Sequence, residues 1–465
     1  MFTEILDRKN TPYARLVNPI LSAALCAVDP YECVYRNIAL LNGDQFTISG
    51  KLYSLDEYDH IYLIGTGKAV QPMAGAVMDK LSSRISGGIL IGKHDDAAFS
   101  MNMPQEISFT LGSHPVPSLS SIQSTIQLTA FLRKVTRKDL VICLISGGGS
   151  ALMTLPYDPL TLEDVQATTK TLLFSGATIN EVNVVRKHLD QVKGGGLARM
   201  AAPATLITMV LSDVIGDDLD AIASGPTVAD HSTYCDAMDI IKKYELEKSL
   251  PQMVIEHLHK GVKGLVPETV KEHDACLAKT CTAIVGSLAQ AAEAAQRKAS
   301  EDGFQTRILT ASLKGEAREV GKRLGMQLRQ MAAVHLPSSR PMCLIAGGET
   351  TVTIKGSGKG GRNQELALSA AREIQGVENC LFVSLATDGE DGPTDAAGGA
   401  VDGSTIQKGI HAGMDAGEFL DRNDAYRYLD AADALIRTGP TGTNVNDLML
   451  MFVFTSRMDQ QGCEA

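Results

Sequence analysis

The sequence predicts an α/β protein of two domains. Short runs rich in Ile, Val and Leu alternate along the chain with longer segments of helical pattern. The runs are apolar throughout, which is typical of strands that are covered on both faces of a parallel sheet. The length of 465 residues exceeds what a single core usually serves. We therefore expect two domains, each built on a parallel sheet.

Eight apolar runs are the predicted strands. Helices are expected between them, and the clearest are an alanine-rich segment at 287–300, which follows the cap candidate Ser287, and a segment at 364–374. In chain order the predicted strands cover residues 60–64, 88–92, 140–145, 205–211, 281–286, 306–309, 341–346 and 381–386.

The strand pattern stops between residues 236 and 278. This segment is rich in Lys, Glu and His and contains Pro251 and Pro267. Domain boundaries usually fall in such polar, proline-containing segments. The predicted organisation is an N-terminal domain at 1–235, a helical connector at 236–278 and a C-terminal domain at 279–465.

The composition narrows the class of protein. A hydrophobic share of 44% and a charged share of 21% are typical of a soluble globular chain. The net charge of −11 disfavours nucleic-acid binding, because phosphate backbones need a basic surface. No stretch reaches the ~20 apolar residues of a membrane span, and the N-terminus lacks a signal pattern. The nine cysteines include no CxxC pair. We expect a soluble cytoplasmic protein.

Six glycine-rich turns follow apolar runs and carry Lys, Arg, Asp or Glu. Bare backbone N–H groups at such turns hold phosphates and other anions. Parallel sheets bind ligands at the carboxyl ends of their strands, so we expect a polyanion site in a cleft between the domains. The turns cover residues 64–68, 145–150, 192–196, 345–349, 359–365 and 386–392.

Standard nucleotide and metal signatures are absent. The turn that ends at Lys68 lacks the spacing of a Walker A loop and the third glycine of the dinucleotide fingerprint. The sequence also has no HExxH, no GxSxG and no zinc-spaced Cys/His set. A nucleotide would therefore be held by another kind of turn.

Candidate residues of the N-terminal half lie around the first three turns. Lys68 can pair with a carboxylate or a transferring phosphoryl oxygen, and a solvated surface lysine is the alternative. Three consecutive glycines at 147–149 favour close approach to an anion over a plain turn.

A polar helix face and an acidic turn come next. Asn183, Arg186 and Asp190 share one face of a helix that runs toward Lys193, and a solvated face is an equal alternative. Asp213 is the first acidic residue after its strand, where it can bind Mg²⁺ or accept a proton, or form an Asx turn.

The C-terminal half offers a cation and a pair of carboxylates. Arg362 can form bidentate contacts with a carboxylate or phosphate, and a solvated helix start is the alternative. Asp388 and Asp391 lack the spacing of a calcium loop, so Mg²⁺ held by one or two carboxylates and the substrate phosphates is favoured. The loop at 438–447 adds hydroxyl and amide groups.

Taken in order, these segments resemble the glycerate 2-kinases of the MOFRL type. The resemblance runs from about Ile61 to Val453, almost the whole chain. It is carried by GTGKA, ISGGGSA, RKHL with KGGGLA, SDVIGD with ASGPT, GGETT, GGRNQE, TDGEDGPT and GPTGTNVND.

The resemblance implies a Rossmann-like N-terminal domain, a MOFRL α/β C-terminal domain and an interdomain cleft. There ATP and a divalent cation would phosphorylate the 2-hydroxyl of D-glycerate, giving ADP and 2-phospho-D-glycerate. The family's key lysine and arginine correspond to Lys68 and Arg362. Ser118 and Asp190 depart from the family pattern, and Asp190 puts a negative charge near Lys193.

The expected roles combine both arguments. Lys68 and Arg362 neutralise carboxylate and phosphoryl charge, Asp213 orients or deprotonates the hydroxyl, and replacing either cation should leave folding nearly unaffected. Alternatives are a nicotinamide-dependent hydroxypyruvate reductase and a phospho-metabolite sensor. Asp388 and Asp391 are the expected Mg²⁺ ligands. The residues expected to bind substrate or nucleotide are Gly67, Ser146, Gly147, Gly148, Gly149, Ser150, Asn183, Arg186, Lys193, Gly347, Gly348, Glu349, Asn363, Gln364, Thr443 and Asn444.

Overall fold

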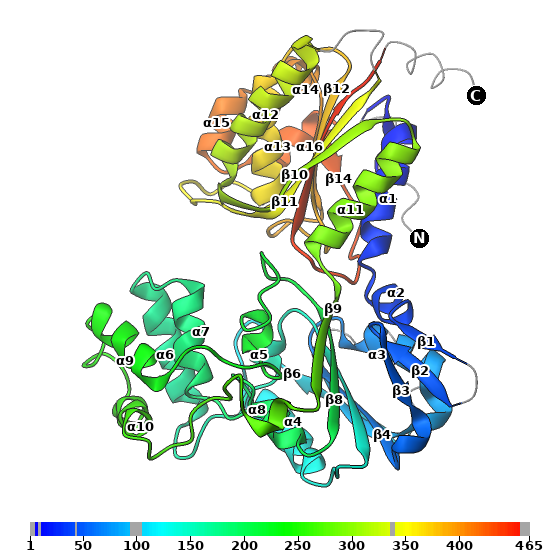
Figure 1. Ribbon diagram of the computed structural model, residues 1–465. Coiled ribbons are helices and arrows are strands. Elements are labelled where there is room, and N and C mark those ends of the chain that lie inside the picture. The colour runs from blue at the N-terminus through cyan, green and yellow to red at the C-terminus, as the bar shows by residue number, and fades with distance from the viewer. Residues whose placement is uncertain (1–4, 8–10, 42–43, 94–104, 335–339, 456–465) are drawn as a thin grey trace. The chain divides into compact units, whose positions relative to one another are not determined.

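The computed structural model describes residues 5–7, 11–41, 44–93, 105–334 and 340–455 (Figure 1). The chain divides into two compact units. The N-terminal unit comprises residues 30–285, and the C-terminal unit comprises residues 1–29 together with 286–465. In the described residues, no helix combines the length and the apolar character that a membrane crossing requires.

These units differ from the predicted division at both ends of the N-terminal domain. Helix α1 (Ala14–Ala27) packs against α11 (Leu288–Glu301) in the C-terminal unit, where it buries an apolar face. The predicted connector instead belongs to the N-terminal unit, because its helices α9 (Tyr234–Lys243) and α10 (Gln252–Val262) share a core with α6 (Leu162–Phe174) and α7 (Ile179–Lys187). The predicted cleft between the domains stays a prediction.

The N-terminal unit is built on a six-stranded sheet of order β6-β5-β4-β7-β8-β9. The pairs β4–β5, β5–β6, β4–β7 and β7–β8 are parallel, as expected. Every strand predicted for this part of the chain is present, and β6 is an additional one. The bounds are β4 His60–Thr66, β5 Ile85–Lys93, β6 Ile107–Gly112, β7 Asp139–Ile145, β8 Thr205–Leu211 and β9 Thr280–Gly286.

A second, small antiparallel sheet in this unit was not predicted. Its strands β1 (Ile38–Leu40), β2 (Gln45–Ile48) and β3 (Lys51–Ser54) are only three or four residues long and partly exposed, so they lack an apolar run. The remaining helices of the unit are α2 Pro30–Tyr35, α3 Val70–Leu81, α4 Leu119–Leu132, α5 Gly149–Leu152 and α8 Gly196–Ala201, with short 3₁₀ turns at Leu55–Glu57, Ser82–Arg84, Ile222–Ser224 and Ala275–Leu277.

The C-terminal unit has a mixed sheet of order β10-β11-β15-β12-β13-β14, so the expected parallel sheet is wrong here. Only β10 and β11 pair in parallel, because β15 inserts between β11 and β12 and runs antiparallel to both. The inner strands β12 and β15 are largely apolar because they are buried on both faces, and burial does not reveal strand direction. The bounds are β10 Gln305–Glu316, β11 Met342–Thr351, β12 Cys380–Ala386, β13 Gly398–Val401, β14 Leu435–Ile436 and β15 Asp447–Val453.

Helices cover both faces of this sheet. Figure 1 shows α1 and α11 together on one face and the remaining helices on the other. The predicted helices at 287–300 and 364–374 are confirmed as α11 and α13. The other bounds are α12 Ala317–Val334, α13 Arg362–Glu373, α14 Thr405–His411, α15 Ala416–Asp421 and α16 Ala425–Ala431.

Candidate active site

The carboxyl ends of β4 and β7 lie at the centre of the N-terminal sheet, where the strand order reverses. The chain proceeds from β4 to β5 and β6 on one side, and from β7 to β8 and β9 on the other. In open α/β sheets such a reversal leaves a crevice at the strand ends in which ligands bind. The predicted turns at 64–68 and 145–150 follow these two strands, so the fold brings both to this end of the sheet.

Hydrogen bonds join the two turns. The Lys68 N–H donates to the Gly147 carbonyl at 2.9 Å, and the Ala69 N–H donates to the Ser146 Oγ at 3.0 Å. Gly67 has a φ of +132°, and a Cβ placed on it would lie 2.1 Å from the Ser146 Oγ. A larger residue at Gly67 would separate the turns. Lys68 is thereby held beside the 146–150 turn with its side chain exposed.

The 146–150 turn presents free donors next to charged side chains. Within the described part of the chain, no group accepts from the N–H of Gly147 or Gly148. A Cβ on Gly147 would lie 2.5 Å from the Asp213 Oδ2, and one on Gly148 would lie 3.3 Å from the Lys68 Cγ. Asp213 and Lys68 therefore lie against the turn. Two N–H donors and an ammonium group suit an oxyanion, and a neighbouring carboxylate can accept a proton.

His114 belongs to the same cluster and was missed from the sequence. A Cβ on Gly148, whose φ is +82°, would lie 2.9 Å from the His114 Cδ2. Burial, reinforced by the positive charges of Lys68 and Lys93, lowers the pKa of His114 to about 4. The ring is therefore neutral at neutral pH and leaves the lysine as the cation of the turn. The only signal in the sequence was a histidine shortly after an apolar segment at 107–112.

Arg186 reaches this turn from α7. Its Nη2 donates to the Ser150 Oγ at 2.7 Å and to the Ser150 carbonyl at 3.3 Å. The Ser150 Oγ also lies 2.8 Å from the Ser224 Oγ. Burial lowers the pKa of Arg186. Arg186 of the predicted polar face therefore contacts the 146–150 turn, whereas Asp190, which follows the end of α7, pairs with Lys193 of the 192–196 turn. Asn183 is buried on the same helix.

The backbone of the 192–196 turn is internal, whereas Lys193 also lines a pocket of this unit, so its binding role stays a prediction. Its Nζ is buried 2.6 Å from the Asp190 Oδ2 and 3.1 Å from the Met153 carbonyl. The N–H groups of Gly194 and Gly195 donate to backbone carbonyls at 3.0 and 2.7 Å. Asp190, the departure from the family pattern, thus neutralises a buried lysine, although burial still lowers the pKa of that lysine.

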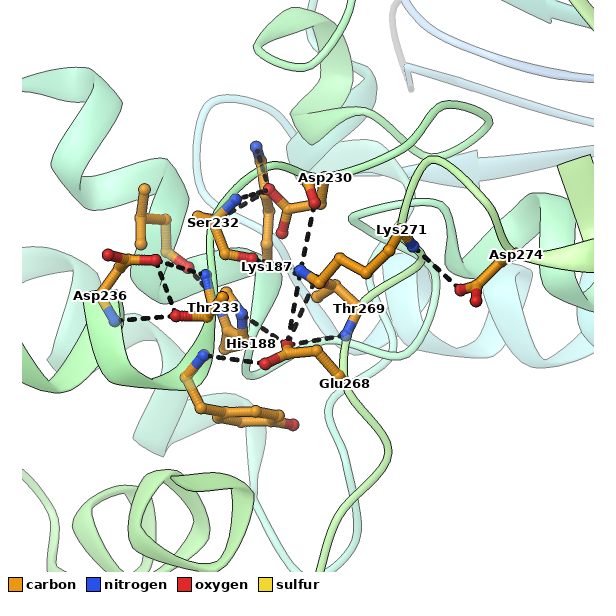
Figure 2. A network of polar contacts seen from close by, with 12 residues as sticks. Lys187, His188, Asp230, Ser232, Thr233, Asp236, Glu268, Thr269, Lys271 and Asp274 are labelled. Carbon is orange, nitrogen blue, oxygen red and sulfur yellow. Dashed lines mark hydrogen bonds and ion pairs between the residues drawn. The ribbon is translucent and has the colours of Figure 1, made fainter. Parts of the chain in front are cut away.

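The end of α7, next to Arg186, is fixed by a polar network (Figure 2). Lys187 pairs with Asp220 and, at 3.2 Å, with Asp230. His188 Nε2 lies 3.0 Å from the Glu268 Oε1. Burial alone would raise the pKa of Glu268, but His188 and two backbone N–H donors lower it to about 2. Since His188 and Glu268 are 80 residues apart, no local pattern predicts this network.

A second cluster of predicted residues lies in the C-terminal unit around Arg362. The Arg362 Nε and Nη2 donate to the two carboxylate oxygens of Asp447 at 2.6 and 3.0 Å, and its Nη1 donates to the Glu349 Oε1 at 2.9 Å. Burial would lower the pKa of Arg362, but Asp447 raises it. Asp447 is fully buried at the start of β15. Arg362 is therefore not a solvated helix start.

Gly347 and Gly348 do not form a turn, which corrects the prediction that they cradle a phosphate. Both lie inside β11, opposite Leu448 and Asp447 of β15. A Cβ on Gly348 would lie 2.1 Å from the Leu313 carbonyl oxygen of the neighbouring strand. The glycine is required by the close approach of two backbones within the sheet.

Asp391 caps α13, a structural role that the sequence did not indicate, and its assignment as a metal ligand stays a prediction. Its two carboxylate oxygens accept from the N–H groups of Asn363 and Gln364 at 3.0 and 2.9 Å. Burial raises the pKa of Asp391 to about 6. The side chains of Asn363 and Gln364 are buried and bond to Ser384 and to the 391–394 loop, so they too are internal.

Three further predicted residues of this unit are Thr443, Asn444 and Asp388. Thr443 is buried and its hydroxyl donates to the Val28 carbonyl at 2.6 Å, while the Asn444 Oδ1 accepts from the Asn446 N–H at 3.1 Å. Their binding roles stay predictions. Asp388 is partly buried, and burial raises its pKa. Among the residues that the structure describes, no three His, Cys, Asp or Glu side chains are grouped to hold a metal ion.

Comparisons with known proteins agree with this architecture. The chain matches the Domain of unknown function (DUF4147) over residues 16–259 and the MOFRL family over residues 342–447. It is 40% identical to the glycerate 2-kinase of Pyrococcus horikoshii, over 94% of this chain and 97% of that protein. It is 41% identical to the D-glycerate 2-kinase of Thermotoga maritima, over 84% of this chain and 90% of that protein.

A solved structure has the same fold. The crystal structure of a glycerate kinase from Thermotoga maritima superposes with a TM-score of 0.81 at 38% identity, over 93% of this chain and 97% of that chain. Sequence and fold thus match over nearly the full length of both proteins. The chain belongs to the family of glycerate kinases that combine a DUF4147 domain with a MOFRL domain.

Proposed function

We propose that this protein transfers the γ-phosphoryl group of ATP to the 2-hydroxyl of D-glycerate, giving ADP and 2-phospho-D-glycerate. The observation that carries the proposal is the 40% identity, over nearly the whole chain, to a protein named glycerate 2-kinase. The chemistry of the crevice supports it, because phosphoryl transfer depends on positioning and on charge neutralisation.

In this proposal the 146–150 turn and its neighbours carry the reaction. The N–H groups of Gly147 and Gly148 hold oxygens of the phosphates, and the Lys68 ammonium neutralises the charge that builds up on the transferred phosphoryl group. Asp213 accepts the proton of the 2-hydroxyl as that oxygen attacks phosphorus. The proton thus moves to the carboxylate while the bond from phosphorus to the leaving ADP oxygen breaks.

Arg362 is the proposed cation of the C-terminal unit. A guanidinium has five N–H donors, and three of those of Arg362 are engaged with Asp447 and Glu349, which leaves two. Those two donors are proposed to bind an anionic group of substrate. Mg²⁺ is proposed as a companion of the nucleotide that neutralises phosphate charge, with Asp388 as its protein ligand. The Asp388 Oδ1 accepts from the Glu390 N–H at 3.1 Å.

The experiment supplies ATP, Mg²⁺ and D-glycerate to the purified protein and adds enolase without phosphoglycerate mutase. Enolase converts only the 2-phosphate into phosphoenolpyruvate, which is followed by its absorbance. Appearance of phosphoenolpyruvate supports the proposal, and Lys68→Ala is the matched control that should form it on the order of 10²-fold more slowly. Accumulation of 3-phosphoglycerate would show that the other hydroxyl is used.

Two alternative functions would give different results with the same purified protein. A hydroxypyruvate reductase would oxidise NADH with hydroxypyruvate and form no ADP. A phospho-metabolite sensor would bind a sugar phosphate and turn over neither substrate. Either result would replace the proposed kinase activity.

A further inference from the structure

A large pocket lies next to the 146–150 turn in the N-terminal unit. Its volume is about 850 Å³, and its walls are α6 on one side and the 115–117 segment on the other. The Gln166 Nε2 donates to the Pro117 carbonyl at 2.7 Å and joins the two walls. The pocket is formed entirely within this unit.

Two contacts make the pocket continuous with the turn. Arg186 lines the pocket and donates to the Ser150 Oγ at 2.7 Å. His114 lies against Gly148, and the three residues that follow it line the pocket. A ligand whose anionic end lies on the N–H groups of the turn therefore has the pocket as the space for the rest of the molecule.

Beside its charged side chains, the lining has large apolar ones that neither glycerate nor a bare phosphate would need. The charged residues of the lining are Glu163, Lys170, Arg186, Asp190 and Lys193. Val116, Leu173 and Phe174 line the pocket although they are 57%, 55% and 80% exposed. Large apolar side chains exposed together at one cavity mark a surface that a ligand covers. The polar side chains of Glu163 and Gln166 lie on the same helix and can bond to hydroxyl groups.

Size and chemistry together identify one part of the reactants. A three-carbon hydroxy acid would fill a small fraction of this volume and has no apolar face. A planar base attached to a ribose has an apolar face that packs on such side chains and hydroxyl groups that need polar partners. It also carries the phosphates that the adjoining turn would hold.

We infer that this pocket holds the nucleoside of the nucleotide substrate, with the phosphates directed to the 146–150 turn past Arg186. The inference rests on the proposed kinase function. It assigns the base to the wall formed by α6 and the 115–117 segment and the charged end to the turn.

The test uses substitutions that narrow the pocket from either wall and leave the 146–150 turn unchanged. Ala167 lines the pocket from α6 and its side chain is exposed, so Ala167→Phe occupies space with little effect on the core. Val116→Trp does the same from the opposite wall. Asn180→Phe is the matched control, because Asn180 is an exposed helical residue of the same unit outside the pocket.

Three measurements follow on each variant: the Kd of ADP by calorimetry, inhibition by inorganic tripolyphosphate, and the KM values of ATP and D-glycerate. We expect Ala167→Phe and Val116→Trp to raise the Kd of ADP and the KM of ATP roughly 10-fold or more, the effect of losing the contacts of one stacked base. Tripolyphosphate has no base, so its inhibition should stay at the wild-type value. The KM of D-glycerate and the thermal midpoint should also be unchanged. Asn180→Phe should change none of them.

Unchanged ADP affinity in both pocket variants would overturn the inference. Inhibition by tripolyphosphate that weakens as much as ADP binding would also overturn it, because the substitutions would then act on the turn itself. Failure of the proposed function is seen separately. Suppose that wild-type protein makes no 2-phosphoglycerate but binds ADP, and that Ala167→Phe weakens this binding. Then the pocket assignment holds and the kinase proposal fails. If wild-type protein binds neither ADP nor ATP, both fail.

Discussion

Lys68 combines a backbone that is fixed by hydrogen bonds with a side chain that is exposed. Its N–H is fixed to the Gly147 carbonyl at 2.9 Å, and its neighbour Ala69 is fixed to Ser146, yet its ammonium group is exposed. The two turns therefore fix the backbone of Lys68, and no ion pair of its ammonium group is found among the described residues. A lysine placed in this way is available to a ligand at little cost to folding.

The first prediction concerns this lysine. Lys68→Ala should lower kcat by on the order of 10²-fold or more, since loss of one preorganised donor costs about 3 kcal/mol of transition-state stabilisation. The thermal midpoint should change little because the side chain is exposed. Lys68→Arg, which keeps the charge but changes its shape, should recover part of the activity. Wild-type turnover in Lys68→Ala would show that this lysine has no part in the reaction.

His114 provides a pH-dependent prediction at the same scale. Its pKa is about 4 in the folded protein and 6.5 in the reference state, so the unfolded chain binds the proton first as the pH falls. The stability that the neutral ring contributes is thus complete above pH 6.5 and is lost as the pH falls toward 4. His114→Gln should therefore lose less stability than wild type between pH 7 and pH 4.5, measured by urea midpoints. Identical losses in the two proteins would contradict the assigned pKa.

Arg362 is the residue for which the expectation from sequence has to change. Its guanidinium compensates the fully buried carboxylate of Asp447, so Arg362→Ala leaves that charge unpaired. We expect a loss of about 3 kcal/mol in the stability of the C-terminal unit, in addition to any loss of activity. The double variant Arg362→Ala/Asp447→Asn should regain much of that stability in thermal unfolding. No recovery would mean that the guanidinium stabilises the unit through other contacts.

At the scale of elements, α13 begins at a buried carboxylate. Asp391 satisfies the N–H groups of Asn363 and Gln364, which have no partner inside the helix. The role of the TDGEDG segment at 387–392 is thus partly to start a helix that is distant in sequence. The partners of this carboxylate are backbone N–H groups, which every residue has. The sequence therefore gives no sign of the cap, and the acidic segment can be read as a metal-binding loop instead.

The cap predicts a loss of stability that does not depend on metal. Asp391→Ala should destabilise the C-terminal unit by about 1–2 kcal/mol because two buried N–H groups lose their acceptor. Asp391→Asn keeps one acceptor oxygen and should lose less. Thermal midpoints measured with and without EDTA distinguish the cap from a metal ligand. An effect that disappears with EDTA would support the metal assignment.

At the scale of the whole molecule, the two ends of the chain build one unit. The first helix, α1, places Val17, Ile20 and Leu21 in the core of the C-terminal unit, each without exposed surface. Fully burying such side chains contributes about 1.5–3 kcal/mol each. The MOFRL-matching segment at 342–447 is therefore stabilised by residues that precede the N-terminal unit.

This arrangement predicts where a deletion acts. Removal of residues 1–27 should speed amide hydrogen exchange in β11, β12 and β15, because their unit loses several kcal/mol of apolar burial. Exchange in β4 and β7 should be unchanged, which provides the internal control within the same molecule. Equal acceleration in both sheets would show that α1 supports the whole protein and not one unit.

The sequence by itself determined the long apolar strands and the first glycine turns. An apolar run such as 140–145 is buried on both faces in any fold that can form, so its identity as a strand follows from composition alone. The spacing of Gly67 and Lys68 likewise indicated a turn at a strand end. Short, half-exposed strands such as β1 and β2 gave no such signal, because their stability comes from pairing with each other.

Only the tertiary structure decided strand direction, partners and roles. Arg362 and Asp447 are 85 residues apart, and β15 places the acid beside the cation by running antiparallel between two strands. The same residue types therefore became an ion pair at Asp447, a helix cap at Asp391 and a neighbour of the glycine turn at Asp213. Local sequence records which chemical groups are present, whereas burial and distance between segments far apart in the chain decide which of them remain available to a ligand.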